Sequence, residues 1–413
     1  MAGVPVTLLD RAEFPRNKPC GGGISIRVLK RFPWLEPHLS RIATHRISRL
    51  YLEGPGGEST VITSDEPAVL MIRRVEFDHL LVTLAKEAGA AVVSGVDIVR
   101  ARAEDDGVRL EARDGRIFEA PLVIAADGVH SIVARRLGIN PGWAPQAVAV
   151  DMMEETPREA LRADPSTLWV SYGYSPARNG ERSTARAAEG YAYIFPKRDH
   201  VNVGIGYVLD HFRSEVDAKP YELQCDFVRR LRERGLVEGN SVRANFTPFI
   251  IPVGGPLKQP GRGRVLAAGD AGGFVNGFTA EGIYYAMVTG ELAARAILGT
   301  PAADVPPRLA ARYAAACDAE VGTELRDSVL VQRHLFADRR RIARVIEAAS
   351  SNPAVTKLVL DYAIGRTPYR QVRRRVIAAA PLAAFRLLLQ YFRTPHLPVA
   401  ARGTTISQPP GHT

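Results

Sequence analysis

The stretch from Gly269 to Ile283 combines small residues with one carboxylate, Asp270, and leads into a run with helical periodicity that ends near Leu298. The first N–H groups of a helix have no partner inside it and carry positive potential, so they attract anions and carbonyl groups. The amides of Gly282 and Ile283 could therefore hydrogen-bond a carbonyl of a flavin ring and stabilise its reduced anion. Asp270 could bind a hydroxyl of the attached sugar chain.

Two other carboxylates follow short apolar runs. Asp10 closes Val4–Leu9, and Asp127, with Gly128 after it, closes Leu122–Ala126. A carboxylate at a strand end of a dinucleotide-binding sheet accepts hydrogen bonds from a ribose diol, and ligands lie outside the carboxyl ends of such strands. A solvated cap at the end of a strand is the alternative for Asp10.

The run Pro19-Cys20-Gly21-Gly22-Gly23 joins a proline-containing loop to a predicted helix near Ser25–Lys30. Three successive glycines let the backbone approach a flat or anionic ligand closely and expose amide donors. A flexible linker is the alternative, but the proline before the glycines and the helix after them favour a fixed turn. The position of Cys20 is equally consistent with an active-site thiol and with a buried one.

Two more segments carry candidate ligands for a cofactor or a substrate. Arg74 stands at the start of a predicted helix, where its guanidinium can reach a phosphate or a ribose. Tyr191, Tyr193 and Phe195 alternate along a predicted strand over Tyr191–Lys197. These aromatic side chains share one face, which is either core packing or the wall of a pocket for a long apolar substrate.

Two blocks of predicted buried strands, 1–135 and 262–300, flank a middle segment with strand-like alternation, and helical periodicity dominates after residue 305. Within the first block, a helix is predicted over Val75–Ala88 with Gly89 at its end, a hairpin turn at Asp114-Gly115, and a short helix over Ser131–Leu137. This layout predicts an α/β fold and resembles the plan of a flavoprotein: a discontinuous FAD-binding Rossmann-like domain with an inserted antiparallel β substrate domain and a helical C-terminal region. The predicted boundaries are 1–140 and 256–305 for the FAD-binding domain, 141–255 for the β-rich substrate domain, 306–394 for the helical region and 395–413 for a flexible tail.

The composition excludes several classes of protein. The 413 residues include 46% hydrophobic and 24% charged residues, which argues against disorder and fibrous repeats, and the formal net charge is +10. The three cysteines are too few and too far apart for a disulfide framework, and no motif suggests a metal site. No export signal is expected in Met1–Leu9, and no apolar stretch reaches the ~18 residues of a membrane span. We expect a cytoplasmic protein without a nucleic-acid partner.

Together these motifs resemble the geranylgeranyl reductase family, within the FAD-binding superfamily that also holds para-hydroxybenzoate-type monooxygenases. The Asp-Gly and Gly-Asp motifs are shared across the superfamily. The turn at Cys20 and the strand before Lys197 point to the reductase branch, where tryptophan usually stands at the position of Tyr193. The resemblance covers about residues 3–300, and its matching segments are Leu8–Arg11, Phe14–Arg16, Lys18–Gly23, Arg74 with Phe77-Asp78, Ala126–Gly128, Tyr191–Lys197 and Gly269–Ile283.

Such a resemblance implies an enzyme that saturates carbon–carbon double bonds of a geranylgeranyl-type isoprenoid lipid. Reduced FAD would supply the hydride, with NAD(P)H or a reduced ferredoxin as the electron donor. It also implies that Cys20 lies near the isoalloxazine as a catalytic residue, and that Gly282 and Ile283 offer amides to that ring. The other implied FAD-binding residues are Asp10 (adenosine ribose), Arg11, Gly21, Gly22, Gly23, Arg74 (ribose-phosphate), Ile98 (adenine), Asp127 and Gly128 (cofactor wall), Gly269 and Asp270 (ribityl or pyrophosphate). The implied substrate pocket contains Tyr191, Tyr193, Phe195 and Pro196.

The sequence departs from the family at its beginning. The family starts with a strand and a Gly-x-Gly-x-x-Gly turn, whose helix holds the FAD pyrophosphate. Only nine residues precede Asp10 here, so we expect about 25–30 residues of strand, turn and helix to be absent, by a late-placed start codon rather than a real truncation. For the chain as written, we predict weak FAD binding and an exposed apolar gap in the sheet.

Two other functions remain open at this point. The first is an aromatic monooxygenase that uses FAD and NAD(P)H, because the cofactor motifs are shared. The second is an inactive truncated product that binds the inner face of a membrane through the basic run Arg373–Arg375 and its apolar neighbours. These neighbours are Val376, Ile377, Ala380, Phe385, Leu388 and Leu389. A helical subdomain packed on the catalytic core is the alternative reading of this region, and peripheral membrane binding would suit a lipid-reducing enzyme as well.

Overall fold

The computed structural model describes residues 3–175, 187–216, 218–301, 305 and 308–379. The predicted tail at 395–413 and the apolar residues from Ala380 onward lie outside these ranges. The chain divides into two compact units: unit 1 holds 1–96, 149–251 and 328–390, and unit 2 holds 97–148, 252–327 and 391–413. The structure is mixed α/β, as predicted, whereas the domain boundaries proposed from the sequence stay a prediction.

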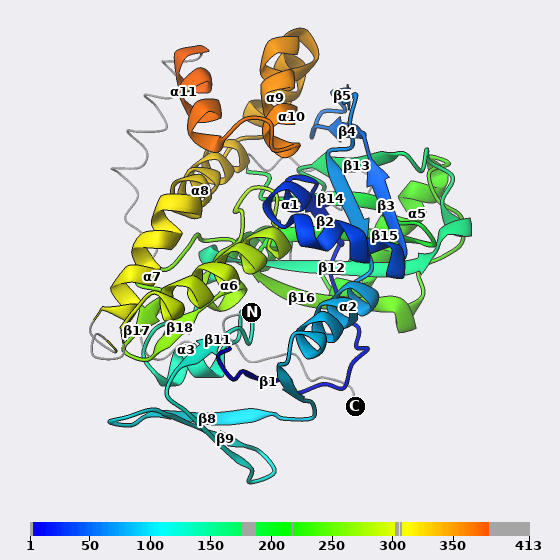
Figure 1. Cartoon of the computed structure of the whole chain (residues 1–413). Coiled ribbons are helices and arrows are strands. Elements are labelled where there is room, and N and C mark those ends of the chain that lie inside the picture. The colour runs from blue at the N-terminus through cyan, green and yellow to red at the C-terminus, as the bar shows by residue number, and fades with distance from the viewer. Residues whose placement is uncertain (1–2, 176–186, 217, 302–304, 306–307, 380–413) are drawn as a thin grey trace. The chain divides into compact units, whose positions relative to one another are not determined.

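Unit 1 is built around a seven-stranded sheet with the strand order β16-β12-β15-β14-β13-β4-β5 (Figure 1). Its strands are β4 (Arg49–Glu53), β5 (Ser59–Thr63), β12 (Val148–Pro157), β13 (Thr167–Tyr172), β14 (Gly190–Pro196), β15 (His200–Val208) and β16 (Phe246–Pro252). Neighbours among β12, β15, β14 and β13 are antiparallel, whereas β13 and β4 run parallel. The sequence analysis missed β4 and β5, an antiparallel hairpin that widens the sheet with residues from early in the chain.

Both faces of this sheet are covered. On one face, α5 (Pro220–Glu233) packs Phe227 against Trp169, with ring centroids 6.4 Å apart. On the other face, Leu168 and Val170 form a core cluster with Ile47 and Met71. The last two come from a three-stranded sheet of β2 (Gly23–Ser25), β6 (Val69–Ile72) and β3 (Thr44–Ile47), in the order β2-β6-β3. The glycine turn at Cys20 leads directly into β2, so this small sheet fixes where the turn lies.

The predicted helix beginning near Arg74 is α2 (Arg74–Glu87), which ends before Gly89 at a backbone φ of +93°. It precedes β7 (Ala91–Val93), which pairs in parallel with β1 (Thr7–Leu9). The apolar residues just before β1 are well exposed, Val4 at 52% and Val6 at 54%. The predicted gap beside this strand stays a prediction.

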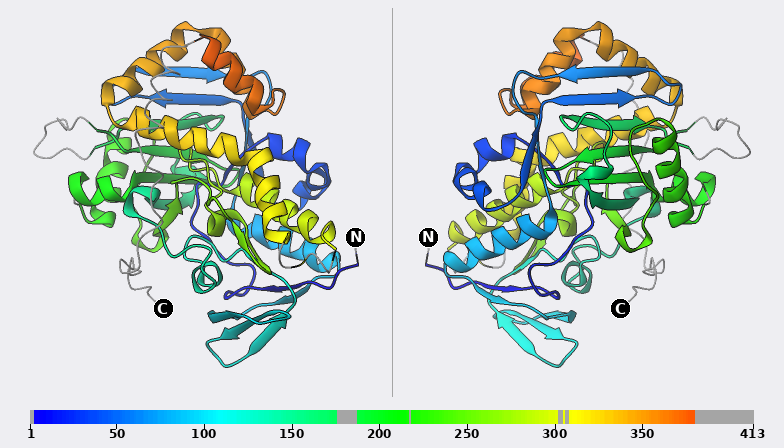
Figure 2. Two further views of the ribbon diagram at one scale, coloured as in Figure 1. Left: turned by 90° about the vertical axis from the view of Figure 1, so that its left-hand side faces the viewer. Right: turned by 90° about the vertical axis from the view of Figure 1, so that its right-hand side faces the viewer.

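The last part of unit 1 is helical. After α8 (Thr323–Phe336), the chain forms α9 (Arg339–Ser351), α10 (Pro353–Ala363) and α11 (Tyr369–Ala379). Figures 1 and 2 show α9 beside the β4–β5 hairpin, and α9 packs on β5. Before this hairpin in the sequence, β2 and α1 (Arg27–Arg31) lie at the end of α10. There, Ser25 Oγ of β2 donates to the carbonyl oxygen of Ala363 at 2.6 Å. The helical periodicity predicted after residue 305 is confirmed for the described residues.

Unit 2 contains two small sheets and a pair of helices. The strands β8 (Ile98–Ala103), β9 (Val108–Ala112) and β10 (Ile117–Ala120) form an antiparallel meander, with Asp114-Gly115 in the predicted hairpin turn. The second sheet has the order β11-β18-β17, with β11 (Val123–Ala125) and β18 (Val265–Ala267) parallel and β17 (Gly261–Arg262) at one side. The helices α6 (Ile283–Leu298) and α7 (Leu309–Cys317) lie side by side (Figure 2).

The strand predicted at Leu122–Ala126 differs in detail from the structure. It forms only over Val123–Ala125, and Ile124 is 39% exposed, so the strand is not fully buried. The short helix predicted after it is α3 (Ile132–Arg136), with Ser131 as its N-cap. Within the described residues, no helix combines the length and the apolar character that crossing a bilayer requires.

Candidate functional site

The glycine turn of unit 1 lies directly on the aromatic strand β14. A Cβ atom at Gly21 would come within 2.8 Å of the Phe195 ring, so the turn touches this ring through bare backbone. Gly22 has a φ of +76°, and a Cβ there would clash with the carbonyl oxygen of Ile72. Both positions require glycine, which supports the fixed turn over the flexible linker.

Cys20 is half-buried at the start of this turn. Its Sγ accepts a hydrogen bond from the Gly22 amide at 3.4 Å, and its carbonyl oxygen accepts one from Asn202 Nδ2 at 3.2 Å. The Arg74 guanidinium lies near the thiol. The structure therefore brings Cys20, Gly21, Gly22 and Arg74 together within unit 1, whereas their roles toward a cofactor stay a prediction.

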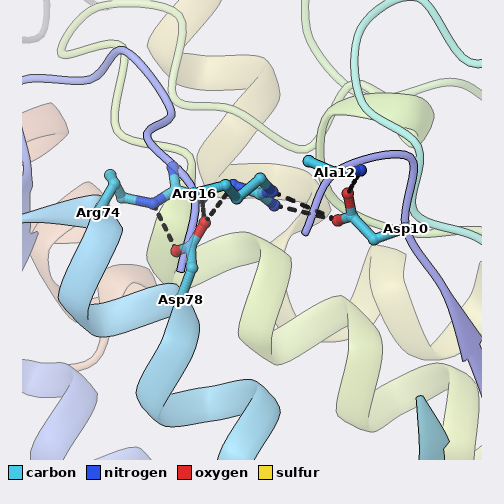
Figure 3. Close-up of polar contacts among 5 residues, drawn as sticks. All are labelled: Asp10, Ala12, Arg16, Arg74 and Asp78. Carbon is cyan, nitrogen blue, oxygen red and sulfur yellow. Dashed lines mark hydrogen bonds and ion pairs between the residues drawn. The ribbon is translucent and has the colours of Figure 1, made fainter. Parts of the chain in front are cut away.

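Asp10 and Arg74 are linked through Arg16, which the sequence analysis did not select as a site residue (Figure 3). Arg16 Nη1 donates to Asp78 Oδ2 at 2.9 Å, and Arg16 Nη2 donates to Asp10 Oδ2 at 3.3 Å. Arg74 donates to both oxygens of Asp78, at 2.7 and 2.8 Å. Asp10 also accepts the Ala12 amide at 2.9 Å. This network fixes the orientation of the Asp10 carboxylate, and its signal in the sequence was the pair of opposite charges at Arg74 and Asp78, four residues apart.

Burial and charge compete at Arg74. Burial by itself lowers the pKa of this guanidinium, but the hydrogen bonds and charge of Asp78 hold the pKa above its ordinary value. Arg74 therefore stays cationic at every physiological pH. A permanent cation next to Cys20 suits an anionic group of a cofactor, which agrees with the predicted role of Arg74.

The three aromatic residues of β14 share one face, as predicted. The ring centroids of Tyr193 and Phe195 are 4.4 Å apart, and those of Tyr191 and Tyr193 are 6.1 Å apart. Tyr193 is buried, whereas Tyr191 and Phe195 are half-buried, and Pro196 closes the strand as a buried residue. The row can be read as core packing or as one wall of an apolar pocket, and both readings use the same face.

The sequence analysis missed a buried ion pair next to the glycine turn. Lys197, only 1% exposed, donates to Glu155 Oε2, and Arg73 Nε donates to Glu155 Oε1 at 2.7 Å. Burial alone would raise the pKa of Glu155, but Lys197 and Arg73 hold this pKa below its ordinary value. Burial lowers the pKa of Lys197, against the opposing charge of Glu155. A Cβ at Gly22 would lie 3.0 Å from Lys197 Nζ, so this ammonium packs directly against the glycine turn.

In unit 2, the loop that follows β18 matches the predicted geometry. Gly269 has a φ of +55°, and its amide donates to Thr289 Oγ1 at 3.0 Å. The helix α6 begins at Ile283, and Gly282 is its N-cap, without a side-chain cap. A Cβ at Gly282 would lie 3.3 Å from Asp270 Oδ1, so this carboxylate lies against the start of the helix. Glycine backbone, a helix N-terminus and a neighbouring carboxylate fit the carbonyl and hydroxyl groups of a flavin.

The Asp127 carboxylate is hydrogen-bonded to the start of α3. Its Oδ2 accepts the amides of Ile132 and Val133 at 2.8 and 3.2 Å, and its Oδ1 accepts the Ser131 hydroxyl. It therefore caps the first turn of α3, a role that the sequence analysis did not consider. The space around Gly128 is open, with a φ of +81°. A cofactor role for these two residues stays a prediction, as it does for Ile98, the first residue of β8, and for the exposed Arg11.

Comparisons with known proteins agree with this geometry. The family described as FAD binding domain matches residues 1–204. The digeranylgeranylglycerophospholipid reductase 2 of Methanopyrus kandleri is 31% identical over 301 residues, which cover 71% of this chain and 70% of that protein. The reductase of the same name from Methanothermobacter thermautotrophicus is 29% identical and covers 81% of this chain and 82% of its own length.

A solved structure shares the fold. The geranylgeranyl bacteriochlorophyll reductase-like protein of Thermoplasma acidophilum superimposes with a TM-score of 0.73 at 19% identity, over 91% of this chain and 93% of that chain. Fold, glycine turns and sequence matches together define an FAD-dependent flavoprotein oxidoreductase. Within that class, the chain belongs to the geranylgeranyl reductase family.

No group of three or more His, Cys, Asp or Glu side chains suited to a metal ion occurs in the described part of the chain.

Proposed function

We propose that this oxidoreductase reduces carbon–carbon double bonds in the isoprenoid chains of a geranylgeranyl-type lipid. The observation that carries the proposal is the contact between the glycine turn and the aromatic row of β14, which joins a predicted flavin-contacting thiol to a predicted lipid-lining face. The relatives named as digeranylgeranylglycerophospholipid reductases support the same substrate class.

The proposed division of labour follows from the side chains. FAD, when bound and reduced, supplies the hydride, and NAD(P)H or a reduced ferredoxin reduces it. In unit 1, Asp10 and Arg74 hold the adenosine ribose and the ribose-phosphate side of the cofactor. In unit 2, Asp270 binds the ribityl or pyrophosphate portion, and the Gly282 and Ile283 amides bind the ring. Tyr191 and Phe195 exclude water from the apolar chain of the substrate.

An anaerobic half-reaction tests this function. The holoenzyme is reduced with dithionite and mixed with a geranylgeranyl lipid, and the return of oxidised-flavin absorbance is followed together with the mass of the lipid. We expect reoxidation by the lipid with a gain of two hydrogen atoms per reduced double bond. Failure of the lipid to reoxidise the flavin, combined with oxygen-dependent hydroxylation of an aromatic compound, would support the monooxygenase instead. Parallel reductions with NADPH, NADH and reduced ferredoxin identify the donor.

A lipid substrate gives a reason for contact with a membrane surface, and the C-terminal helices offer one. On α11, Arg374 and Arg375 are exposed next to Val376 and Ile377, which are 41% and 40% exposed. On α9, Val345 is 48% exposed beside the exposed Arg344. Basic side chains next to apolar ones suit an interface with anionic lipids. We propose that this face gives the enzyme peripheral affinity for membranes.

A further inference from the structure

The face of the large sheet that carries the aromatic row also carries two carboxylates. Strand pairing places Gly204 of β15 opposite Tyr193, and Gly206 opposite Asp151 of β12. A Cβ at Gly204 would clash with the ring and hydroxyl of Tyr193. The Tyr193 ring therefore lies flat across β15, and its hydroxyl reaches the next strand, β12.

At the end of that reach, Tyr193 Oη donates to Asp151 Oδ2 at 3.2 Å, with Oδ1 at 3.4 Å. Asp151 is 7% exposed, and within the described residues no ion pair reaches it. The titratable groups that face this pair are Tyr191 from β14, Tyr172 beyond it on β13, and Cys20 from the glycine turn. None of them is a cation. The carboxyl thus has only neutral hydrogen-bond partners among the described residues, the Tyr193 phenol and the Met152 backbone.

Glu155, four residues further along the same strand and on the same face, has the opposite environment. Lys197 and Arg73 hold Glu155 in its ionised form, as described above. Burial without a cation instead raises the pKa of Asp151 to about 7, against the smaller opposing effect of the Tyr193 hydrogen bond. Two carboxylates whose environments push their pKa values apart are the usual sign of a division between an acid and a permanently charged group.

We propose that Asp151 and Tyr193 form a proton relay that delivers the proton of the reduction. The inference rests on the proposed function, because a double bond that receives a hydride at one carbon needs a proton at the other. When Asp151 carries its proton, its carboxyl O–H donates to the phenol oxygen and leaves the Tyr193 O–H free for the double bond. Tyr193 is the catalytic residue: this O–H bond breaks as the new C–H bond forms. Asp151 acts through Tyr193: its carboxyl O–H bond breaks as the phenol O–H bond is restored. The carboxylate then recovers a proton from water, and the electron pair of the second C–H bond arrives with the hydride from the reduced flavin.

Two isosteric substitutions test the relay, Asp151→Asn and Tyr193→Phe. Their matched controls are Glu154→Gln, a buried carboxylate on the same strand bound by Ser241 and Val242, and Tyr207→Phe, a buried tyrosine whose hydroxyl donates to the Tyr174 carbonyl. The measurement is single-turnover reoxidation of the reduced holoenzyme by a geranylgeranyl lipid between pH 5 and pH 9, in light and heavy water. We expect the wild-type rate to fall above neutral pH. Both relay variants should lose about 100-fold in rate, with little change in the half-saturating lipid concentration.

The relay variants should also lose the pH dependence and the solvent isotope effect of the wild-type enzyme, whereas both controls keep them. Relay variants that match the wild-type rate and pH profile would overturn the proposal. Each variant is first checked for bound FAD and for its circular dichroism spectrum, so that a folding defect is recognised.

A second readout separates the relay from the proposed function. Infrared difference spectra of the oxidised holoenzyme without lipid report protonated carboxyl groups. We expect a carboxyl band that titrates near neutral pH, shifts in Tyr193→Phe and is missing in Asp151→Asn. If this band is present but the wild-type enzyme does not reduce the lipid, the proposed function fails while the proton-holding pair stands. If the band is absent, the relay is overturned whatever the enzyme reduces.

Discussion

Gly22 shows how strictly a single position can be constrained by its surroundings. Its φ of +76° is unfavourable for any residue with a Cβ, and a Cβ would also clash with the Ile72 backbone. Gly57 offers a matched control, because its φ is +94° but nothing lies within 4 Å of the added atom. The pair separates backbone strain from steric exclusion.

We predict that Gly57→Ala lowers the free energy of unfolding by about 1–2 kcal/mol, through strain alone. Gly22→Ala should cost about 3 kcal/mol or more, because a backbone atom must also move. Urea denaturation of both variants measures the difference. Equal losses in the two variants would show that the turn can relax around a side chain.

A second prediction at the scale of one residue concerns Asp151 and pH. The pKa of this carboxyl is about 7 in the native state and near 3.8 in the unfolded chain. Between these pH values the native state binds more protons, so the contribution of Asp151 to stability falls as pH rises, by at most about 4 kcal/mol. Above pH 7 both states are ionised, and this contribution no longer changes with pH.

Denaturation of wild type and Asp151→Asn between pH 4 and pH 8 checks this sign. We expect the stability of the variant relative to wild type to increase across that interval, while Glu154→Gln shows no comparable trend. A constant difference between wild type and Asp151→Asn would mean that the carboxyl is already ionised at pH 4.

At the scale of elements, Arg16 joins the loop after β1 to the N-terminal part of α2 through Asp10 and Asp78 (Figure 3). We predict that Arg16→Met destabilises the protein by about 1–2 kcal/mol and weakens FAD binding about tenfold, because the Asp10 carboxylate loses its fixed orientation. Fluorescence titration with FAD and urea denaturation measure the two effects.

Arg41→Met provides the control, since Arg41 forms an exposed ion pair with Glu87 at the other end of the same helix. Such a pair contributes less than about 1 kcal/mol, and its loss should leave FAD binding unchanged. If Arg16→Met and Arg41→Met behave alike, the Arg16 network has no part in holding the cofactor.

Local sequence signals predicted some of these elements well. Gly89 marks the end of α2, and Asp114-Gly115 marks a hairpin turn, because each rule depends on neighbours in the chain. The strands β4 and β5 were missed, since their place beside β13 depends on a parallel pairing across more than a hundred residues. Similarly, Gly204 and Gly206 of β15, which lie between Tyr193 and Asp151, gave no sign in the sequence that the Tyr193 hydroxyl would meet Asp151, 42 residues away in the chain.

For the whole molecule, the charge of +10 gains meaning from where the basic residues lie. We predict that the protein floats with vesicles that contain anionic lipid at low salt, and that raised salt releases it because screening weakens the attraction. A charge reversal at two positions of α11, Arg374→Glu with Arg375→Glu, should abolish flotation.

A double substitution of equal charge, Arg100→Glu with Arg113→Glu, is the control, because both side chains are exposed in unit 2, Arg100 on β8 and Arg113 directly after β9. It changes the net charge as much but leaves α11 intact. If both double variants lose flotation equally, net charge rather than the α11 face explains binding.

The contact between the two ends of unit 1 also constrains the order in which the protein can mature. Glu66 pairs with Arg366, Gly365 lies against Arg27, and Gly54 approaches Ile346. At a synthesis rate of about 5–20 residues per second, the 300 residues between Glu66 and Arg366 take roughly 15–60 s to emerge. During that interval the β4–β5 hairpin and α1 leave the ribosome without the helices that later cover them. The packing of the β4–β5 hairpin and α1 is thus completed last, although these elements are synthesised early. A nascent chain would most need a chaperone during this interval.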